Sequence, residues 1–171
     1  MHLYIFGGQT PSSIDGNLYS FNTETQVWTY WPNNGGTIQP GRKSGSMVAV
    51  DGYLYLWGGS THTGDITNED TFRYDFEEMG WFLVTTNGPK SRCYAGTAVL
   101  GDSFYYVFGW DESEQQNHDG IDKFNTTTQS WSQVEIDRDL GEGLYKGLLR
   151  NDFAYTIADS YMYIHGGYGD H

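Results

Sequence analysis

The chain has 171 residues, with 22 acidic and 9 basic side chains and a net charge of −13. This acidity disfavours binding to the phosphate backbone of nucleic acid and favours basic protein partners. No apolar run is long enough to span a membrane, and no signal peptide is expected. The single cysteine, Cys93, excludes an internal disulfide. The cytoplasm is therefore the expected compartment, with an extracellular location left open.

Short runs of strand-forming residues follow one another along the whole chain. Asp51-Gly52 separates two of them, 46–50 and 53–57, in the way expected of a two-residue hairpin turn. In chain order the expected strands are 3–6, 17–21, a segment at Trp28, 46–50, 53–57, 71–75, a segment at Trp81, 96–100, 104–108, 121–125, a segment at Trp131, 153–157 and 161–164. No stretch shows the spacing of an amphipathic helix, so the sequence predicts an all-β fold.

Three kinds of marker recur in a fixed order at a spacing near fifty residues, which is typical of repeated supersecondary units such as propeller blades. Glycines mark the strand ends, in pairs except at Gly109-Trp110, which we align with the pairs: Gly7, Gly8, Gly58, Gly59, Gly109, Gly166 and Gly167. The other markers are Trp28, Trp81 and Trp131, expected to pack between neighbouring sheets, and Arg42, Arg92 and Arg150.

The order of these markers carries a resemblance to a known family. An apolar run with Gly-Gly is followed by an aromatic-Asp pair such as Tyr74-Asp75, a spaced tryptophan, and a proline and arginine as in Pro40-Gly41-Arg42. This pattern resembles the kelch repeat of β-propellers over essentially the whole chain. The resemblance implies four-stranded antiparallel blades that close into a ring, commonly of six or seven blades.

The expected strands do not make a whole number of blades. With the four strands of a blade called a to d, the chain reads bcd, abcd, abcd, ab, in approximate repeat units 3–53, 54–103, 104–160 and 161–171. At about 50 residues a blade, this is a propeller segment of about half a ring. The remaining blades are expected either from the same longer chain or from a second copy, although the extra strand argues against joining two copies.

The lengths of the connections predict which face binds. The a–b and c–d turns, such as 23–26 and 126–129, are short, whereas the b–c and d–a connections are long and must lie together at the other end of each blade. Binding residues concentrate on loops held by a rigid scaffold. We therefore expect a protein partner, unidentified by the sequence, at the face formed by the long loops, which we call the loop face.

Several loop residues are candidates for contact with the partner, although each could instead have a purely structural role. Arg42, Arg92 and Arg150 are expected near the central axis, where kelch-like proteins can hold acidic ligands, but hydrogen bonding to neighbouring loops would recur equally. The other candidates are Tyr94, His62, Trp110 and Asp111, with packing between blades as the alternative for Trp110.

Fewer residues support a catalytic function. Asp111, Glu112, Glu114, His118 and Asp119 could ligate a cation, but their order matches no calcium or zinc motif, so a solvated acidic loop is expected, with no metal and no cofactor. Likewise, resemblance to propeller oxidases would require Cys93 joined to a tyrosine, and resemblance to specifier proteins an iron site of which Glu114 and His118 form only part. The sequence thus favours a non-catalytic scaffold or adaptor over a metal-dependent propeller enzyme. Asn125 begins a glycosylation sequon whose use stays open.

Overall fold

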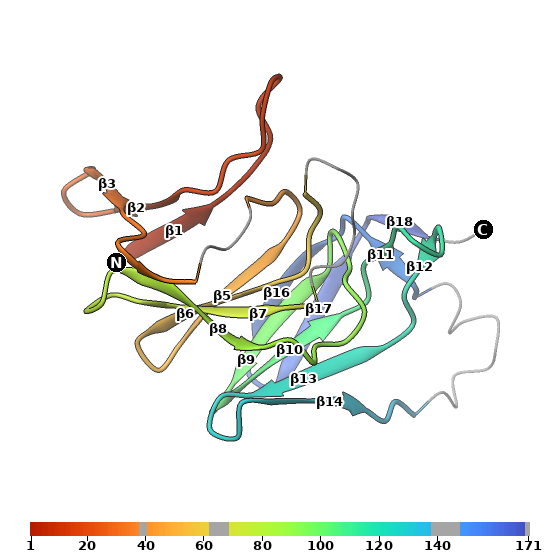
Figure 1. Ribbon diagram of the computed structural model, residues 1–171. Coiled ribbons are helices and arrows are strands. Elements are labelled where there is room, and N and C mark those ends of the chain that lie inside the picture. The colour runs from red at the N-terminus through yellow and green to blue at the C-terminus, as the bar shows by residue number, and fades with distance from the viewer. Residues whose placement is uncertain (38–40, 62–68, 138–147, 170–171) are drawn as a thin grey trace.

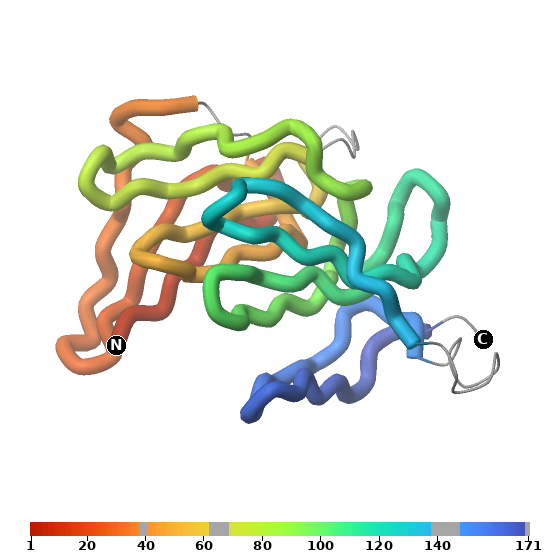
Figure 2. Tube along the Cα trace, turned by 90° about the horizontal axis from the view of Figure 1, so that it is seen from below, coloured from red at the N-terminus to blue at the C-terminus, as the bar shows by residue number. Residues whose placement is uncertain are grey.

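A computed structural model describes residues 1–37, 41–61, 69–137 and 148–169. Its strands form antiparallel sheets that stand side by side in chain order (Figures 1 and 2). We call these sheets the first to fourth blades. Within the described ranges there is no helix, and therefore none that is long and apolar enough to cross a membrane.

The blades differ in their number of strands. The first is β1 (His2–Phe6), β2 (Leu18–Asn22) and β3 (Trp28–Trp31). The second is built on β5 (Ser46–Val50), β6 (Tyr53–Trp57), β7 (Thr71–Asp75) and β8 (Gly80–Thr85). The third is β9 (Gly96–Leu100), β10 (Ser103–Val107), β13 (Ile121–Asn125) and β14 (Ser130–Val134), and the fourth is a hairpin of β16 (Ala154–Ala158) and β17 (Tyr161–His165).

The predicted all-β fold and the strand order bcd, abcd, abcd, ab are therefore confirmed. Three further pairings were not predicted. β4 (Gly35–Gly36) adds to β8 in parallel, β11 (Trp110–Asp111) pairs with β12 (Gln116–Asn117), and β15 (Arg150–Asn151) pairs with β18 (Tyr168–Gly169). The exact limits of the four repeat units stay a prediction.

Apolar side chains pack at the junctions between successive blades. Between the first and second blades, Tyr4 and Phe6 pack on the cluster of Leu54, Leu56, Phe72, Tyr74 and Trp81. Between the second and third, Val48, Val50, Tyr55 and Trp57 meet Phe104, Tyr106 and Phe124. Because strand residues alternate between the two faces of a sheet, each blade gives one set to the preceding junction and the other set to the following one.

The alignment of Gly109 with the first glycine of each pair is wrong by one residue. The second glycine of each pair, Gly8 and Gly59, donates its N–H to the carbonyl of the next arginine in the chain, and Gly109 makes this same bond to Arg150 at 3.2 Å. Phe108 therefore takes the first-glycine position, at a φ of 56°. Its buried side chain packs in the cluster that includes Phe153, and this burial offsets the strain of a left-handed aromatic residue.

The glycine pairs are needed because neighbouring blades approach closely there. A Cβ on Gly7 would lie 2.2 Å from the carbonyl oxygen of Arg42, and one on Gly58 would lie 2.7 Å from that of Arg92. Both glycines also have left-handed φ values, of 72° and 69°. A side chain at either position would meet both backbone strain and a clash with the next blade.

The connections divide into two sets at opposite ends of the blades. The short a–b and c–d turns lie together on the left of Figure 1, and the long connections, with β11, β12 and β18, lie on the right. A hydrogen-bonded path joins the blades at this second end. The Tyr94 N–H donates to the carbonyl of Ser44, and the Asp152 N–H donates to that of Tyr94, each at 3.2 Å. Backbone hydrogen bonds therefore connect the segments of successive blades that form the loop face.

Candidate binding site on the loop face

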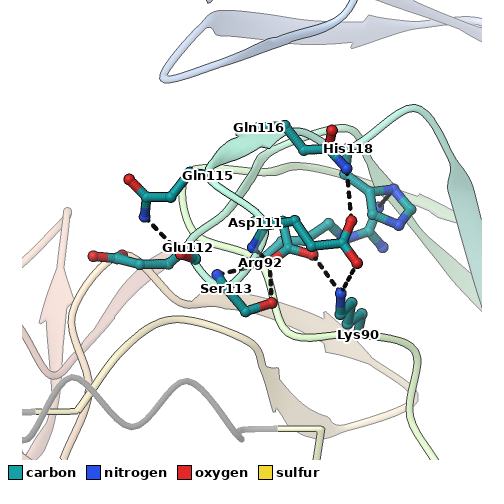
Figure 3. Close-up of polar contacts among 9 residues, drawn as sticks. Lys90, Arg92, Asp111, Glu112, Ser113, Gln115, Gln116 and His118 are labelled. Atoms are coloured by element: carbon teal, nitrogen blue, oxygen red, sulfur yellow. Dashed lines mark hydrogen bonds and ion pairs between the residues drawn. The ribbon is translucent and has the colours of Figure 1, made fainter.

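The third blade carries a polar cleft on the loop face, with a volume of about 440 Å³. Its walls come from the β11–β12 hairpin, from the connections before β13 and β9, and from Leu149 directly before β15. The lining residues are Lys90, Asp111, Glu114, Gln116, Asn117, His118, Asp119 and Leu149. Several of them are drawn in Figure 3, where Lys90 approaches the hairpin from a separate segment.

Asp111 holds the tip of this hairpin together and is almost fully buried. Its Oδ1 accepts hydrogen bonds from the Ser113 N–H at 2.9 Å, the Ser113 hydroxyl at 2.6 Å and the Glu114 N–H at 3.1 Å, while Lys90 Nζ lies 3.2 Å from its Oδ2 (Figure 3). Burial alone would raise the pKa of Asp111, but the hydrogen bonds and the Lys90 charge hold it below its ordinary value. Asp111 is therefore a structural anchor that stays ionised.

Lys90 and Glu114 link two loops across the cleft. The Lys90 ammonium pairs with Glu114 Oε1, and this hydrogen bond is the main reason that the pKa of Lys90 is raised. Glu114 Oε2 also accepts a hydrogen bond from Gln116 Nε2 at 2.6 Å. Half of the Glu114 side chain still faces solvent, so its carboxylate is both held in place and open to a partner.

Behind the cleft lies a buried ionic network centred on Arg92, of which 1 % is exposed. Arg92 Nη2 pairs with Asp122, Nη1 donates to the Gly120 carbonyl at 3.2 Å, and the guanidinium lies 5.2 Å from the Trp57 ring centre. His118 Nδ1 accepts hydrogen bonds from Arg92 Nη1 and from the Gly120 N–H, both at 2.9 Å. Because arginine can only donate, His118 is neutral and carries its proton on Nε2.

All three arginines donate hydrogen bonds to backbone carbonyls. Arg42 is as buried as Arg92, and its Nη1 donates to the Gly58 carbonyl at 3.0 Å. Arg150 makes the equivalent bond to the Gly166 carbonyl at 2.9 Å. Arg42 and Arg92 are buried and donate to backbone carbonyls, so their guanidinium groups are not exposed to a ligand, while ligand contact by Arg150 stays a prediction. For Arg42 and Arg92 this is the structural alternative that the recurrence of the arginines also predicted.

The other candidates have separate positions. Tyr94 is 44 % exposed on the loop face, at a left-handed φ of 57°. Trp110 is half-buried in β11 and exchanges backbone hydrogen bonds with Cys93. Asp111 lies in the cleft as an anchor, and His62 lies outside the described residues. The structure thus brings Asp111 together with Glu114 and His118, but it places Tyr94 on the neighbouring path between blades.

Two residues that organise the site were not among the candidates from the sequence. Lys90 is a loop lysine without a pattern around it, so its bridging position depends on the fold. Asp122 had a usable signal, because it occupies the strand position at which the first two blades carry Tyr19 and Phe72. A carboxylate at a position that faces a blade junction requires a cationic partner, and Arg92 is that partner.

The acidic and histidine side chains of the cleft are paired with other protein groups. Among the residues that the structure describes, no three His, Cys, Asp or Glu side chains lie close enough to hold a metal ion. Glu114 and His118 are instead engaged by Lys90 and by Arg92. Burial raises the pKa of Cys93 to about 11, so its thiol stays protonated and unreactive.

Comparison with known proteins agrees with this architecture. The sequence profile of the KLHDC2/KLHL20/DRC7 Kelch-repeats domain matches residues 1–167. The chain belongs to the kelch-repeat family. Over 77 % of its length, it is 30 % identical to the N-(sulfonatooxy)prop-2-enimidothioate sulfolyase of Thlaspi arvense, and the match covers 40 % of that protein. Over 98 % of its length, it is 27 % identical to the Kelch domain-containing protein 3 of Homo sapiens, and the match covers 46 % of that protein. The kelch-repeat chain thus spans less than half the length of these relatives.

Proposed function

We propose that this kelch-repeat chain is part of a non-catalytic scaffold or adaptor that binds a protein partner through the loop face. The cleft beside the β11–β12 hairpin is the observation that carries this proposal. Asp111 and Lys90 fix its walls through an ion pair and hydrogen bonds, and fixed walls reduce the entropy lost on binding.

The charge of the cleft indicates the chemistry of the partner. Asp111, Glu114 and Asp119 face a single lysine, and the neutral His118 adds no positive charge. A partner that presents Lys or Arg would pair with the solvent-facing oxygens of Glu114 and would enter the negative field of a chain with a net charge of −13. The proposed partner is therefore a basic peptide segment of another protein.

The test uses an array of defined Lys- and Arg-containing peptides, read out as binding to the purified chain. Glu114→Lys should weaken binding of the peptides that score with the wild type by at least about tenfold, which corresponds to 1.4 kcal/mol. Glu24→Lys is the matched control, because Glu24 is exposed on the c–d turn at the opposite end of the blades. Equal losses in the two variants, or loss in Glu24→Lys alone, would show that the loop face is not the binding surface.

A metal-dependent propeller enzyme is the second candidate, and the similarity to the Thlaspi sulfolyase is what favours it. Metal analysis of the purified chain separates the two proposals. A stoichiometric transition metal that is lost in a His118→Ala variant would favour the enzyme. The cytoplasmic location stays a prediction from composition.

A further inference from the structure

The outer edge of the third blade is formed by β14, which pairs with β13 on its inner side and lies at the lower margin of Figure 1. Among the residues that the structure describes, no segment pairs with its outer side. Proteins usually protect an edge strand with a charged side chain, a proline, a β-bulge or a covering segment. β14 has the sequence Ser-Trp-Ser-Gln-Val and a regular register with β13, so it lacks the first three of these protections as well.

The equivalent edge of the second blade is protected in two ways. The register of β8 with β7 is irregular, and residues 33–37, which include β4, lie along the outer side of β8. The Thr37 N–H donates to the Trp81 carbonyl at 2.7 Å, and the Trp81 N–H donates to Asn33 Oδ1 at 3.0 Å. The Leu83 N–H donates to Thr37 Oγ1 at 3.4 Å. An extended segment thus satisfies the outward backbone groups of this edge.

β14 presents the same backbone groups at the same positions. Trp131 pairs across the strands with Phe124, in the way that Trp81 pairs with Tyr74. In antiparallel strands, each residue directs its N–H and C=O together, either toward the paired strand or away from it, and the direction alternates along the strand. Because Trp81 directs both groups outward, Trp131 does so too, and so does Gln133 two residues later. These backbone groups are able to bind a further strand.

The connection that corresponds to the β4 segment follows another path. β4 belongs to the connection 32–45 between β3 and β5, which has 14 residues. The connection between β8 and β9, at 86–95, has only 10. Its Gly88 lies against the Glu69 carbonyl, and its Lys90 lines the loop-face cleft. The shorter connection therefore runs directly to the loop face and leaves the outer side of β14 uncovered.

We infer that the outer edge of β14 binds an extended segment of a partner protein, which joins the third blade as a strand parallel to β14. Its main chain bonds to the outward N–H and C=O groups of Trp131 and Gln133, as in other complexes that form by strand addition. β14 contributes no residue to the loop-face cleft, so this is a second interaction surface, independent of the proposed function.

The side chains near the edge indicate the chemistry of the partner segment. Ser130 stands where the second blade has Gly80, and a Cβ on Gly80 would collide with the Gly35 carbonyl oxygen, so the partner strand pairs only beyond Ser130. Ser130 and Ser132 are exposed and polar, which favours uncharged polar residues in the partner. Glu135 is exposed directly after β14, so a Lys or Arg that follows the partner strand would pair with it.

The test adds blocked six-residue peptides to the 171-residue chain and follows its backbone amides by NMR. The peptides have Asn first, Thr fifth and Lys sixth, the spacing of Asn33 and Thr37, with Ser, Thr or Val between them. We expect saturable shifts of the Trp131 and Gln133 amide signals. Hydrogen exchange of these two amides should become at least about tenfold slower when the peptide is bound.

Two variants at one position separate main-chain pairing from side-chain contact. Gln133→Pro removes the outward N–H but no bond to β13, so it should fold and should bind at least about tenfold more weakly. Gln133→Val is the matched control, because it keeps this N–H and should bind as the wild type does. Peptides methylated on alternate backbone nitrogens give a test that needs no variant. Only the set that loses the N–H groups facing β14 should fail to bind.

Several results would overturn the inference. These are no binding by any of the peptides, equal binding by the Pro and Val variants, or equal binding by both methylated sets. Trp131 and Gln133 amides that exchange as slowly as that of Trp81 in the chain alone would show that the edge is already covered. If that protection accompanies a dimer that Gln133→Pro dissociates, a second copy covers the edge and the assignment to a partner protein is wrong.

Discussion

Arg42 and Arg92 show how one neighbour sets the environment of a buried cation. Each stacks on a ring and donates to a carbonyl of its own blade, but strand c opposite Arg92 carries Asp122, whereas strand c opposite Arg42 carries Phe72. As a result, Nε and Nη2 of Arg42 have no hydrogen-bond acceptor among the residues that the structure describes, and burial lowers the pKa of Arg42 to about 10. The carboxylate of Asp122 opposes the same effect of burial on Arg92.

Removing only one member of the Arg92–Asp122 ion pair should therefore lower the stability of the protein. Arg92→Met leaves the Asp122 carboxylate buried without its cation, and we expect the free energy of unfolding to fall by about 3 to 5 kcal/mol. The double variant Arg92→Met/Asp122→Leu removes both charges and should recover most of that loss. Urea unfolding of the three proteins measures these values, and a loss below about 1 kcal/mol in Arg92→Met would show that the network contributes little.

His118 should make stability depend on pH. Burial, followed by the charge of Arg92, lowers its pKa in the folded state below the value of about 6.5 for an unfolded chain. The unfolded state therefore takes up the proton first, so the stabilisation is complete above pH 6.5 and is lost as pH falls through 6.5 toward the lower folded value. His118→Asn keeps an acceptor oxygen but cannot titrate. Unfolding free energies measured from pH 7.5 to 5.5 should fall less steeply in this variant than in the wild type, and parallel curves would contradict the assignment.

At the scale of strands and blades, tryptophans at equivalent strand positions differ in burial according to the blade that carries them. Trp81 and Trp28 occupy the same place on strand d, opposite Tyr74 and Phe21. Trp81 is 1 % exposed because the first blade covers it, whereas Trp28 is 56 % exposed on the uncovered side of the first blade. The same repeat residue is thus a core residue in one blade and a surface residue in another.

This difference predicts unequal costs of truncation. Trp81→Ala should lower the free energy of unfolding by about 3 to 5 kcal/mol, as a large-to-small change in a core. Trp28→Ala should cost less than about 1 kcal/mol at protein concentrations low enough to keep the chain monomeric, since most of its area is then in water. Thermal and urea unfolding of both variants provide the comparison. Similar losses at the two positions would mean that Trp28 is covered in solution.

The strands were predictable from the sequence because their signals are local. Asp51-Gly52 and the alternating runs around it define the hairpin of β5 and β6 at the predicted residues. Phe108 was not predictable as a left-handed residue, because its conformation is stabilised by burial against residues distant in sequence such as Phe153. β4 was missed for a related reason, since Gly35 and Gly36 have no side chains to form a pattern and pair only because Gly80 lets them approach.

At the scale of the molecule, the position of the loop face could be predicted from the sequence, but the roles of the individual residues on it could not. Loop lengths alone placed the long connections at one end of the blades. The roles within that face depend on contacts between segments, such as Lys90 with Glu114 and Arg92 with Asp122, which no spacing in the sequence encodes. Arg42, Arg92 and Arg150 all donate to backbone carbonyls, although Arg92 uses Gly120 rather than the position equivalent to Gly58 and Gly166, so recurrence alone could not separate structural residues from binding residues.

The incomplete ring leaves an apolar face on the first blade, and this face should cause the isolated chain to associate. Leu3, Ile5, Trp28 and Tyr30 are each about half exposed on it, whereas Leu54, Leu56 and Trp81, the counterparts of the first three in the second blade, are buried in a junction. Contiguous apolar surface of this kind is uncommon on soluble monomers, and pairing of two such faces would remove it from water. We therefore expect sedimentation velocity to show a concentration-dependent equilibrium for the 171-residue chain.

Trp28→Lys should shift this equilibrium toward monomer, because an unpaired ammonium buried between the paired faces is unfavourable. Tyr168→Lys is the control, since Tyr168 is 73 % exposed on β18, away from the first blade, and should leave association unchanged. Leu100→Asp should also retain it, because Leu100 lies on the third blade. A folded monomer whose sedimentation does not depend on concentration would show that the first blade tolerates its exposed face without a neighbour.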